Sequence, residues 1–582
     1  MVARIRRGGR ELDRPWFAHW PAGVPKSLTY PRQPLHQLLR DAAKEHGDQT
    51  ATLFYGAKLT YPQLDEQSDR FAAGLRKIGV KKGDRVALLL PNTPAYVIAF
   101  FGTLRAGGTV VQSNPLYTPR ELAELWSDAG ASVVVTLDLF VPNVLKAMPK
   151  TMVKQVVVAD VGDFLPGLLA AVYPMKKKKD LKKAGHWPLA IPAEPWVQAF
   201  TDLLETPPDP AKDAPVNPEN DVAVLQYTGG TTGTPKGAML THANLVANVL
   251  QGVAWIPHRP GERMLAALPF FHVLGLTVAM LIPIKMGATM VLYPNPRDIG
   301  AVLKLITKTK PTLMLGVPTM YVAMLNHPKL AKADLRSIRA CLSGGAPLPV
   351  EVKRKWDELT GGSLVEGYGL SETSPITHAN PLVEGALVKE CIGLPVPDTD
   401  CRIVDVETAM RDMPTGEPGE LAIKGPQVMK GYWGKREETD RVLRDGWLYT
   451  GDIARIDEDG YFHIIERKKD LIIASGFNVY PREVEEVLFE HPAVQEAAAI
   501  GIPDAYRGET VKAFVVLKAG KAATAEEIVA FCKERLAPFK VPKLVEFRKE
   551  LPKSLVGKVL RRALREEELA KKPIPAASKT NP

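Results

Sequence analysis

Cysteine is scarce in this sequence, and its spacing excludes two kinds of structural support. Only four cysteines occur among 582 residues, and no two of them are arranged as CxxC. Neither a zinc site nor a disulfide framework is therefore predicted. We expect such a chain in a reducing compartment, the cytoplasm. The four residues are Cys341, Cys391, Cys401 and Cys532.

No secretory signal is expected either, and only one long hydrophobic run occurs. The opening letters MVARIRRGG are basic, but no apolar segment follows them. Residues 264–284 contain no Asp, Glu, Lys or Arg, and the run is long enough to cross a bilayer. Pro269 and Pro283 interrupt it, and His272 lies inside it. We therefore expect a strand that ends at Pro269 and then a buried helix, not a membrane span.

Acidic residues are outnumbered, 65 Asp and Glu against 75 Lys and Arg, which gives a net charge of +10. This excess suits nucleic acid, an anionic membrane or anionic small molecules as partners. No nucleic-acid-binding motif accompanies it, so nucleic acid is not an expected partner. The positive charge is concentrated at 176–179, Lys182 and Lys183, directly after the apolar stretch 164–175. We predict peripheral contact with the inner face of the cell membrane; the alternative is a solvated surface insertion.

Strands and helices alternate along the first half of the chain, which predicts an α/β fold. A buried strand at 85–90 precedes a helix that starts at Thr93-Pro94 and ends near Arg105. A second helix begins at Thr118-Pro119, between strands at 110–111 and 132–136.

The last hundred residues have a different pattern, typical of a small α+β domain. A helix is expected from Pro481, and strands are expected at 497–502 and 512–517. The chain is also too long for one compact core, so at least two domains are predicted.

A loop rich in glycine and threonine follows the predicted strand 221–227. Residues 228–237, TGGTTGTPKG, hold four glycines, four threonines and one lysine. Glycine lets the backbone approach an anion, and the amides, hydroxyls and Lys236 can all donate to phosphate oxygens. Lys236 precedes Gly237, so the segment is not the GxxxxGK[ST] loop. The composition favours a phosphate-binding loop over a flexible turn.

The segment YTGGTTGTPKG resembles the phosphate loop of the adenylate-forming superfamily, which comprises acyl-CoA synthetases, peptide-synthetase adenylation domains and luciferases. Six further segments resemble motifs of that superfamily and follow in the expected order. Together they are far more specific than any one motif. They are 269–272 (PFFH, acyl pocket), 343–348 (SGGAPL, adenine loop), 367–373 (GYGLSET, adenine and magnesium), 449–452 (YTGD, ribose), 466–470 (ERKKD, hinge) and 551–561 (LPKSLVGKVLR, catalytic lysine).

The resemblance assigns roles to particular residues. Tyr368 would stack on adenine, Glu372 would bind Mg²⁺ together with Thr228, and Asp452 would bind the ribose with help from Arg467. Taken alone, these would be read as a core tyrosine, a solvated acid and a turn aspartate. The full set implied for ATP and AMP is Thr228, Gly229, Gly230, Thr231, Thr232, Gly233, Thr234, Lys236, Gly344, Gly345, Ala346, Gly367, Tyr368, Gly369, Ser371, Glu372, Thr373, Asp452 and Arg467.

The same resemblance implies a catalytic lysine, a hinge and two further pockets. Lys558 would stabilise the charge that develops on the α-phosphate. Lys469 would be the pivot on which a small mobile C-terminal domain rotates between two half-reactions. His272 would form a wall of the acyl pocket. The acyl-binding set is Phe271, His272, Val273 and Leu276, and the coenzyme A loop is Ser475, Gly476 and Phe477.

Several phrases are similar to those of bacterial long-chain fatty-acid–CoA ligases in particular, among them 14–25, RPWFAHWPAGVP, and 113–122, SNPLYTPREL. The implied substrates are a fatty acid, ATP and coenzyme A, with Mg²⁺ as cofactor; the sequence is compatible with an oligomer. An aryl or medium-chain ligase and an enzyme that loads a carrier protein are the alternatives. The tryptophan gate of some fatty-acyl members has no counterpart near Leu276.

The resemblance also implies a domain plan. A large N-terminal domain, 1–466, would consist of layered α/β subdomains and a β-barrel-like part. A hinge, 467–470, would lead to the small domain, 471–570, and a disordered tail, 571–582.

Overall fold

The computed structural model describes residues 13–183, 187–228, 235–474, 477–504, 508–553 and 559–571. The chain divides into two compact units. The first consists of Met1–Asp400 and Ile423–Leu448, and the second of Cys401–Ala422 and Tyr449–Pro582. The domain plan based on the resemblance remains a prediction, and its tail from 572 onward lies outside the described residues.

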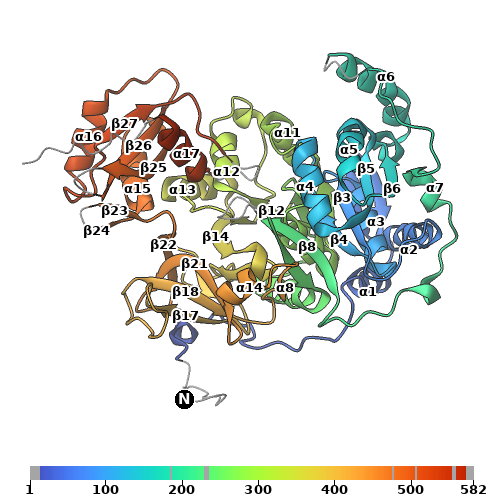
Figure 1. Cartoon of the computed structure of the whole chain (residues 1–582), viewed down its shortest axis with the longest axis horizontal. Coiled ribbons are helices and arrows are strands. Elements are labelled where there is room, and N and C mark those ends of the chain that lie inside the picture. Colours follow the sequence, from blue (N-terminus) through green and yellow to red (C-terminus); the bar gives the residue numbers. More distant parts are fainter. Residues whose placement is uncertain are drawn as a thin grey trace, which may run out of the picture. The chain divides into compact units, whose positions relative to one another are not determined.

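An eight-stranded sheet forms one layer of the first unit (Figure 1). Its order is β19-β9-β8-β4-β3-β5-β6-β7; the strands from β8 to β7 run parallel, and β9 and β19 are antiparallel additions. The α/β prediction is thereby confirmed, because parallel neighbours need crossover connections. The strands are β3 (Arg85–Leu89), β4 (Thr109–Gln112), β5 (Ala131–Leu137), β6 (Gln155–Ala159), β7 (Val197–Ala199), β8 (Val222–Thr228), β9 (Lys236–Thr241) and β19 (Gly431–Tyr432).

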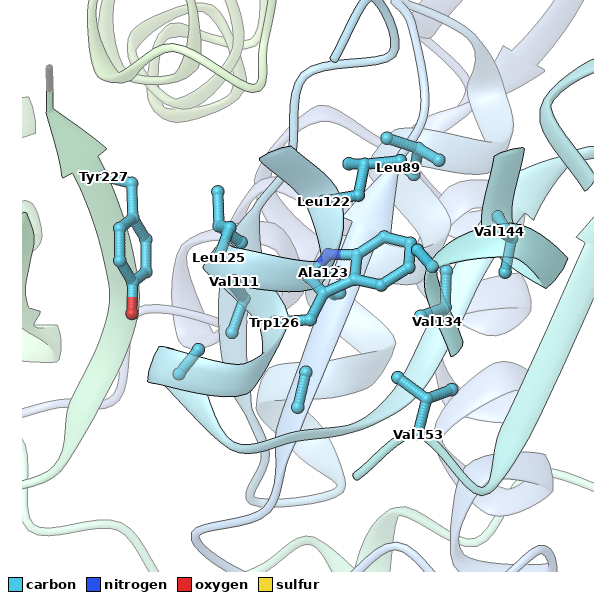
Figure 2. Packing of buried hydrophobic residues seen from close by; sticks show 14 of the residues in the cluster. Leu89, Val111, Leu122, Ala123, Leu125, Trp126, Val134, Val144, Val153 and Tyr227 are labelled. Carbon is cyan, nitrogen blue, oxygen red and sulfur yellow. The ribbon is translucent and has the colours of Figure 1, made fainter. Parts of the chain in front are cut away.

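Two helices of this layer begin where the sequence predicts. Helix α3 (Pro94–Arg105) starts after Thr93, although the Thr93 side chain makes no capping hydrogen bond. Helix α4 (Pro119–Ala129) starts with a reciprocal capping box between Thr118 and Glu121. Figure 2 shows how α4 packs: the buried indole of Trp126 lies among apolar side chains of α4, the sheet and α5 (Val141–Ala147). Its Nε1 donates to Ser113 Oγ at 3.0 Å, so the one polar atom of the indole is satisfied.

A nine-stranded sheet forms the second layer of the first unit. Its order is β16-β15-β14-β13-β12-β10-β11-β1-β2, with a parallel centre and antiparallel strands at both edges. The strands are β1 (Thr50–Phe54), β2 (Ala57–Thr60), β10 (Arg263–Ala266), β11 (Thr289–Leu292), β12 (Leu313–Gly316), β13 (Ala340–Ser343), β14 (Ser363–Gly369), β15 (Ile376–Ala379) and β16 (Leu394–Pro395).

The hydrophobic run 264–284 lies in this layer. Its strand, β10, ends at Ala266, three residues earlier than the prediction, because the backbone turns before Pro269. Helix α9 (Val273–Leu276), the π-helical segment η6 (Thr277–Leu281) and α10 (Ile282–Met286) follow as one buried stretch. Within the described part of the chain, no helix is long and apolar enough to cross a membrane.

The second unit contains most of one five-stranded sheet and the whole of another. Helices α15 (Pro481–Glu490), α16 (Ala525–Lys533) and α17 (Arg561–Lys571) accompany the latter, as expected for an α+β domain. The first sheet comprises β17 (Asp400–Val404), β18 (Gly419–Lys424), β20 (Leu443–Arg444), β21 (Trp447–Ile456) and β22 (Phe462–Arg467). The second comprises β23 (Ile472–Ala474), β24 (Phe477–Val479), β25 (Val494–Asp504), β26 (Gly508–Leu517) and β27 (Leu544–Phe547).

The lysine cluster lies in a helix that the sequence pattern does not predict. The apolar stretch and the lysine cluster together form α6 (Gly167–Lys183), with Pro174 inside it. The remaining helices of the first unit are α1 (Gln37–His46), α2 (Tyr61–Lys77), α7 (Phe200–Leu204), α8 (His242–Trp255), α11 (Ile299–Thr309), α12 (Pro318–Leu325), α13 (Val350–Thr360) and α14 (Arg436–Val442).

Candidate active site

The predicted phosphate loop connects two paired strands. Thr228 ends β8, Lys236 begins β9, and their Cα atoms are direct partners in the antiparallel ladder. The ends of the loop are therefore fixed opposite each other. Its central residues, Gly229, Gly230, Thr231, Thr232, Gly233 and Thr234, lie outside the described residues.

Lys236 is nearly buried, with 9% of its surface exposed, and its ammonium group has two partners. Nζ forms a short ion pair with Glu438 on α14 and lies 5.4 Å from the centre of the Tyr432 ring. The hydrogen bond from Lys236 is the main reason that the pKa of Glu438 lies below its ordinary value. The ammonium group predicted to bind phosphate is thus paired with the carboxylate of Glu438.

Glu372 lies in the short helix η8 (Ser371–Thr373), next to β8 and β9. Its Oε1 accepts a hydrogen bond from the Tyr432 hydroxyl at 2.7 Å, and its carbonyl oxygen accepts one from the Met429 amide at 2.8 Å. Burial, with the nearby Glu372 charge, raises the pKa of Tyr432. The Thr373 hydroxyl donates within the turn, to carbonyls of Leu370 and Pro375. Tyr432 thus contacts Glu372 through its hydroxyl and Lys236, at the end of the predicted phosphate loop, through its ring.

The surroundings of Glu372 fit a magnesium ion that is bound mainly through substrate phosphates. Mg²⁺ commonly takes one or two carboxylates from the protein and completes its shell with phosphate oxygens and water. The second carboxylate oxygen of Glu372, Oε2, has no hydrogen-bond partner among the described residues. No group of three His, Cys, Asp or Glu side chains there could hold a metal by itself.

The two predicted adenine segments meet beside the acyl segment. Gly344, Gly345 and Ala346 follow β13, while Gly367, Tyr368 and Gly369 end β14. A Cβ atom on Gly344 would lie 3.7 Å from the Gly367 carbonyl oxygen and 3.4 Å from the side chain of Leu274 on α9. The Tyr368 ring packs edge-on against His378, with 5.8 Å between ring centres.

His272 caps the helix that carries the predicted acyl-pocket residues. Its Nδ1 accepts a hydrogen bond from the Leu274 amide at 3.2 Å. Burial lowers the pKa of His272 to about 4, so the imidazole is neutral near pH 7 with its proton on Nε2. Phe271 is partly exposed, whereas Val273 and Leu276 are fully buried. In the same helix, a Cβ on Gly275 would lie 2.1 Å from the Pro269 carbonyl oxygen.

An apolar cavity of about 40 Å³ lies between helix α8, segment η6 and the central strands of the nine-stranded sheet. Its lining contains no charged side chain; Gly252, Trp255, Val278, Ile282 and Met314 are members. A Cβ on Gly252 would lie 2.3 Å from Ile282 Cδ1, so glycine leaves this space open. Phe271, His272, Val273 and Leu276 do not line it, but it borders the same helical stretch.

In the second unit, the predicted ribose residues form an ion pair. Asp452 on β21 faces Arg467 on β22, with 3.2 Å between Oδ1 and Nε. The Asp452 side chain is buried, and its backbone amide donates to Thr450 Oγ1 at 3.1 Å. The carboxylate is thus held in a fixed orientation.

The predicted hinge and catalytic segment meet at one arginine. Lys469 is exposed in the turn after β22. Arg561, at the start of α17, donates to Glu466 at 2.9 Å and forms two bonds with Glu485, at 2.6 and 3.0 Å. Lys558, Ser475 and Gly476 lie outside the described residues, and of Phe477 only the backbone is described, in β24.

Sequence reasoning did not find Tyr432, Glu438 or Arg561. Tyr432 and Glu438 are in the segment GYWGKREE, some sixty residues after Glu372, and no spacing rule connects them. Tyr432 reaches its place because β19 pairs with β9, which puts it opposite Ala238.

Known proteins resemble this chain over nearly its whole length. The sequence profile of the AMP-binding enzyme family matches residues 39–433, and that of the AMP-binding enzyme C-terminal domain matches 483–558. A long-chain-fatty-acid–CoA ligase of Bacillus subtilis (strain 168) is 51% identical, over 96% of this chain and 99% of that protein. A long-chain-fatty-acid–CoA ligase of Escherichia coli O6:H1 is 43% identical, also over 96% of this chain and 99% of that protein. The crystal structure of an anthranilate CoA ligase with anthranoyl-AMP is 29% identical with a TM-score of 0.81, covering 93% of this chain and 98% of that one.

Proposed function

Because the chain belongs to the AMP-binding enzyme family, we propose that it joins a long-chain fatty acid to coenzyme A at the expense of ATP. One observation carries the proposal: relatives that are 51% and 43% identical over nearly the whole chain are long-chain-fatty-acid–CoA ligases. Such coverage includes both units, and with them every predicted motif.

The proposed reaction has two steps. A carboxylate oxygen of the fatty acid attacks the α-phosphorus of ATP, and the bond to the bridging oxygen breaks as pyrophosphate leaves. The sulfur of coenzyme A then attacks the carbonyl carbon of the acyl-adenylate, its proton passes to solvent, and AMP departs. A carboxylate is already a nucleophile near pH 7, so the first step needs charge stabilisation, not a base. A neutral His272 is consistent with that requirement.

Charge stabilisation is assigned to Lys236, to Lys558 and to a magnesium ion that Glu372 would hold. Lys236 would exchange Glu438 for phosphate oxygens, and Lys558 would reach the α-phosphate. When bound at Glu372, with Thr228 nearby, Mg²⁺ would neutralise part of the triphosphate charge. Tyr432 supports this assignment because it orients one carboxylate oxygen and leaves the other for the metal.

The second step is assigned to a rotated small domain. Lys469 would be the pivot, and Ser475, Gly476 and Phe477 would line the path of the coenzyme A arm. The exposed position of Lys469 in a turn suits a pivot.

The acyl chain would extend from the His272 region toward the apolar cavity between α8 and η6, whose volume of about 40 Å³ would take only the end of the chain. A lining without charged side chains suits an alkyl chain. An aryl acid is the main competing substrate, because the solved structure with a TM-score of 0.81 is an anthranilate CoA ligase. Transfer to a carrier protein is the other alternative.

Pyrophosphate release, measured with palmitate, octanoate and coumarate, with and without coenzyme A, tests the proposal. We expect palmitate to have the highest kcat/KM and palmitoyl-CoA to appear only when coenzyme A is present. A preference for coumarate would overturn the long-chain assignment. Release of pyrophosphate without any CoA thioester would favour transfer to a carrier protein.

Peripheral contact with an anionic membrane also belongs to this proposal. It would bring the enzyme to the surface in which long-chain acids dissolve, and its basis is the helix α6.

A further inference from the structure

Helix α6 has two faces of different character. Successive residues of an α-helix are separated by about 100°, so positions 173, 177 and 181 share one side. Tyr173 and Lys177 are partly buried on that side, and Leu181 is 6% exposed. This inner face holds the helix on the first unit, at its edge beside β5 and β6 (Figure 1).

Lys177 is the anchor of the inner face. Its Nζ forms short ion pairs with Asp138 and Asp160, which directly follow the carboxyl ends of β5 and β6. One lysine of the cluster is therefore used for structure. It also fixes the rotation of the helix about its axis, and so determines what the opposite face presents.

The outer face is apolar along its first half and basic along its second. Leu168, Val172 and Met175 are spaced i, i+4 and i+7, and they are 81%, 41% and 69% exposed. Lys176, Lys179, Lys182 and Lys183 continue the same side and are exposed. None of these four lysines has an ion-pair partner among the described residues.

We propose that the outer face of α6 docks on an anionic membrane surface. Leu168, Val172 and Met175 would enter the boundary between headgroups and acyl chains, and the four lysines would contact lipid phosphates. Exposed apolar side chains in one stripe, continued by exposed lysines, match such a surface in both polarity and charge. A protein partner would have to supply an apolar patch followed by an acidic one, whereas an anionic bilayer supplies both everywhere.

The size of the effect follows from the charges. A lysine near an anionic surface strengthens binding about fivefold at moderate ionic strength, so four should contribute a factor of at least one hundred. Salt screens this attraction because the Debye length falls to about 3 Å at 1 M. The proposal does not depend on the acid that the enzyme activates.

Co-sedimentation with vesicles tests the surface. The full chain should bind vesicles of phosphatidylcholine and phosphatidylglycerol (7:3) and should bind pure phosphatidylcholine at least tenfold more weakly. The variant with Lys176, Lys179, Lys182 and Lys183 all changed to Gln should lose at least tenfold in its partition coefficient. The matched control changes four exposed lysines elsewhere on the first unit, Lys304, Lys308, Lys329 and Lys332, to Gln and should bind like the original.

A second measurement reports insertion directly. The four native cysteines are buried, so Met175→Cys can be labelled selectively with an environment-sensitive dye. Anionic vesicles should shift its emission to the blue, and dye at Lys304→Cys should not respond. Equal losses in both lysine quadruple variants, or an unshifted emission from position 175, would overturn the proposal. Pyrophosphate release in detergent should be unchanged in every variant, which separates this test from that of the proposed function.

Discussion

The hydroxyl of Tyr432 donates to the carboxylate of Glu372 at 2.7 Å, while the ring of the same tyrosine lies 5.4 Å from the ammonium of Lys236. One side chain thus contacts both the predicted metal ligand and the predicted phosphate ligand. Tyr432→Phe keeps the ring and removes only the hydroxyl. A hydrogen bond to a charged group contributes about 1.5–3 kcal/mol, so we expect a roughly tenfold or greater rise in the Mg²⁺ concentration for half-maximal activity.

A magnesium titration of pyrophosphate release measures this effect. Tyr55→Phe, at an exposed tyrosine on a turn, is the matched control and should leave the titration unchanged. If Tyr432→Phe lowers the rate equally at every magnesium concentration, Tyr432 does not orient the metal ligand.

If Lys236 binds phosphate as proposed, Glu438 competes with ATP for its ammonium group. Glu438→Gln removes the negative charge and keeps the shape, so the ammonium becomes available to phosphate at a lower cost. We expect a severalfold lower KM for ATP, an unchanged KM for the fatty acid and a similar kcat. Glu437→Gln, one position away on α14, is the control. A higher KM for ATP would mean that Glu438 positions Lys236 productively instead of occupying it.

Gly252 sets the space between α8 and Ile282. In Gly252→Ala, the new methyl group would push the end of Ile282 into the apolar cavity. Each methylene excluded from an apolar site loses about 0.8 kcal/mol, close to fourfold in kcat/KM. We expect palmitate to lose much more than octanoate, measured as pyrophosphate release. Equal losses for both acids would place the acyl chain elsewhere.

Lys558 and Lys469 are predicted to act in different half-reactions. Lys558→Ala should reduce pyrophosphate release by about 10²–10³, as removal of an oxyanion donor does, yet still convert synthetic acyl-adenylate to acyl-CoA. Lys469→Pro should do the reverse, because proline fixes φ near −65° and restricts a pivot. Lys549→Ala and Lys469→Ala are the controls. Parallel loss of both activities in both test variants would contradict domain alternation.

Acid should destabilise the first unit through buried histidines. Burial lowers the pKa of His242 to about 4 and that of His378 to about 3. Between the ordinary value of about 6.5 and these values, the unfolded chain binds protons that the folded unit does not. Stability should therefore fall by up to about 1.4 kcal/mol per pH unit for each histidine as the pH drops from 6.5 to 4. Denaturant unfolding at several pH values measures the slope, and His378→Asn should make it shallower.

Local sequence patterns predict much of the fold and indicate the family. The helix start at Thr118-Pro119 and the strand before the glycine-rich loop depend on neighbours in sequence, and the structure confirms both. The prediction places the end of β10 at Pro269, whereas the backbone turns three residues earlier. Helix α6 was missed because its apolar residues lie on both faces of its first half, which leaves no clear 3.6-residue period.

Part of the site depends on pairings between distant segments. Tyr432 meets Glu372 only because a two-residue strand, β19, adds to β9. Arg561 meets Glu466 and Glu485 across some 95 and 76 positions. Sequence alone has no signal for such contacts, since a tyrosine or an arginine in a polar segment usually faces solvent.

Gly275 restricts how this protein can diverge. Even the smallest side chain there would lie 2.1 Å from the backbone oxygen of Pro269, and a backbone oxygen cannot rotate away as a side chain does. Every descendant that keeps α9 in this position must therefore keep glycine at 275. A saturation library selected for growth on fatty acid should return glycine at 275 in all survivors while Leu274, whose side chain can rotate, drifts among several hydrophobic residues.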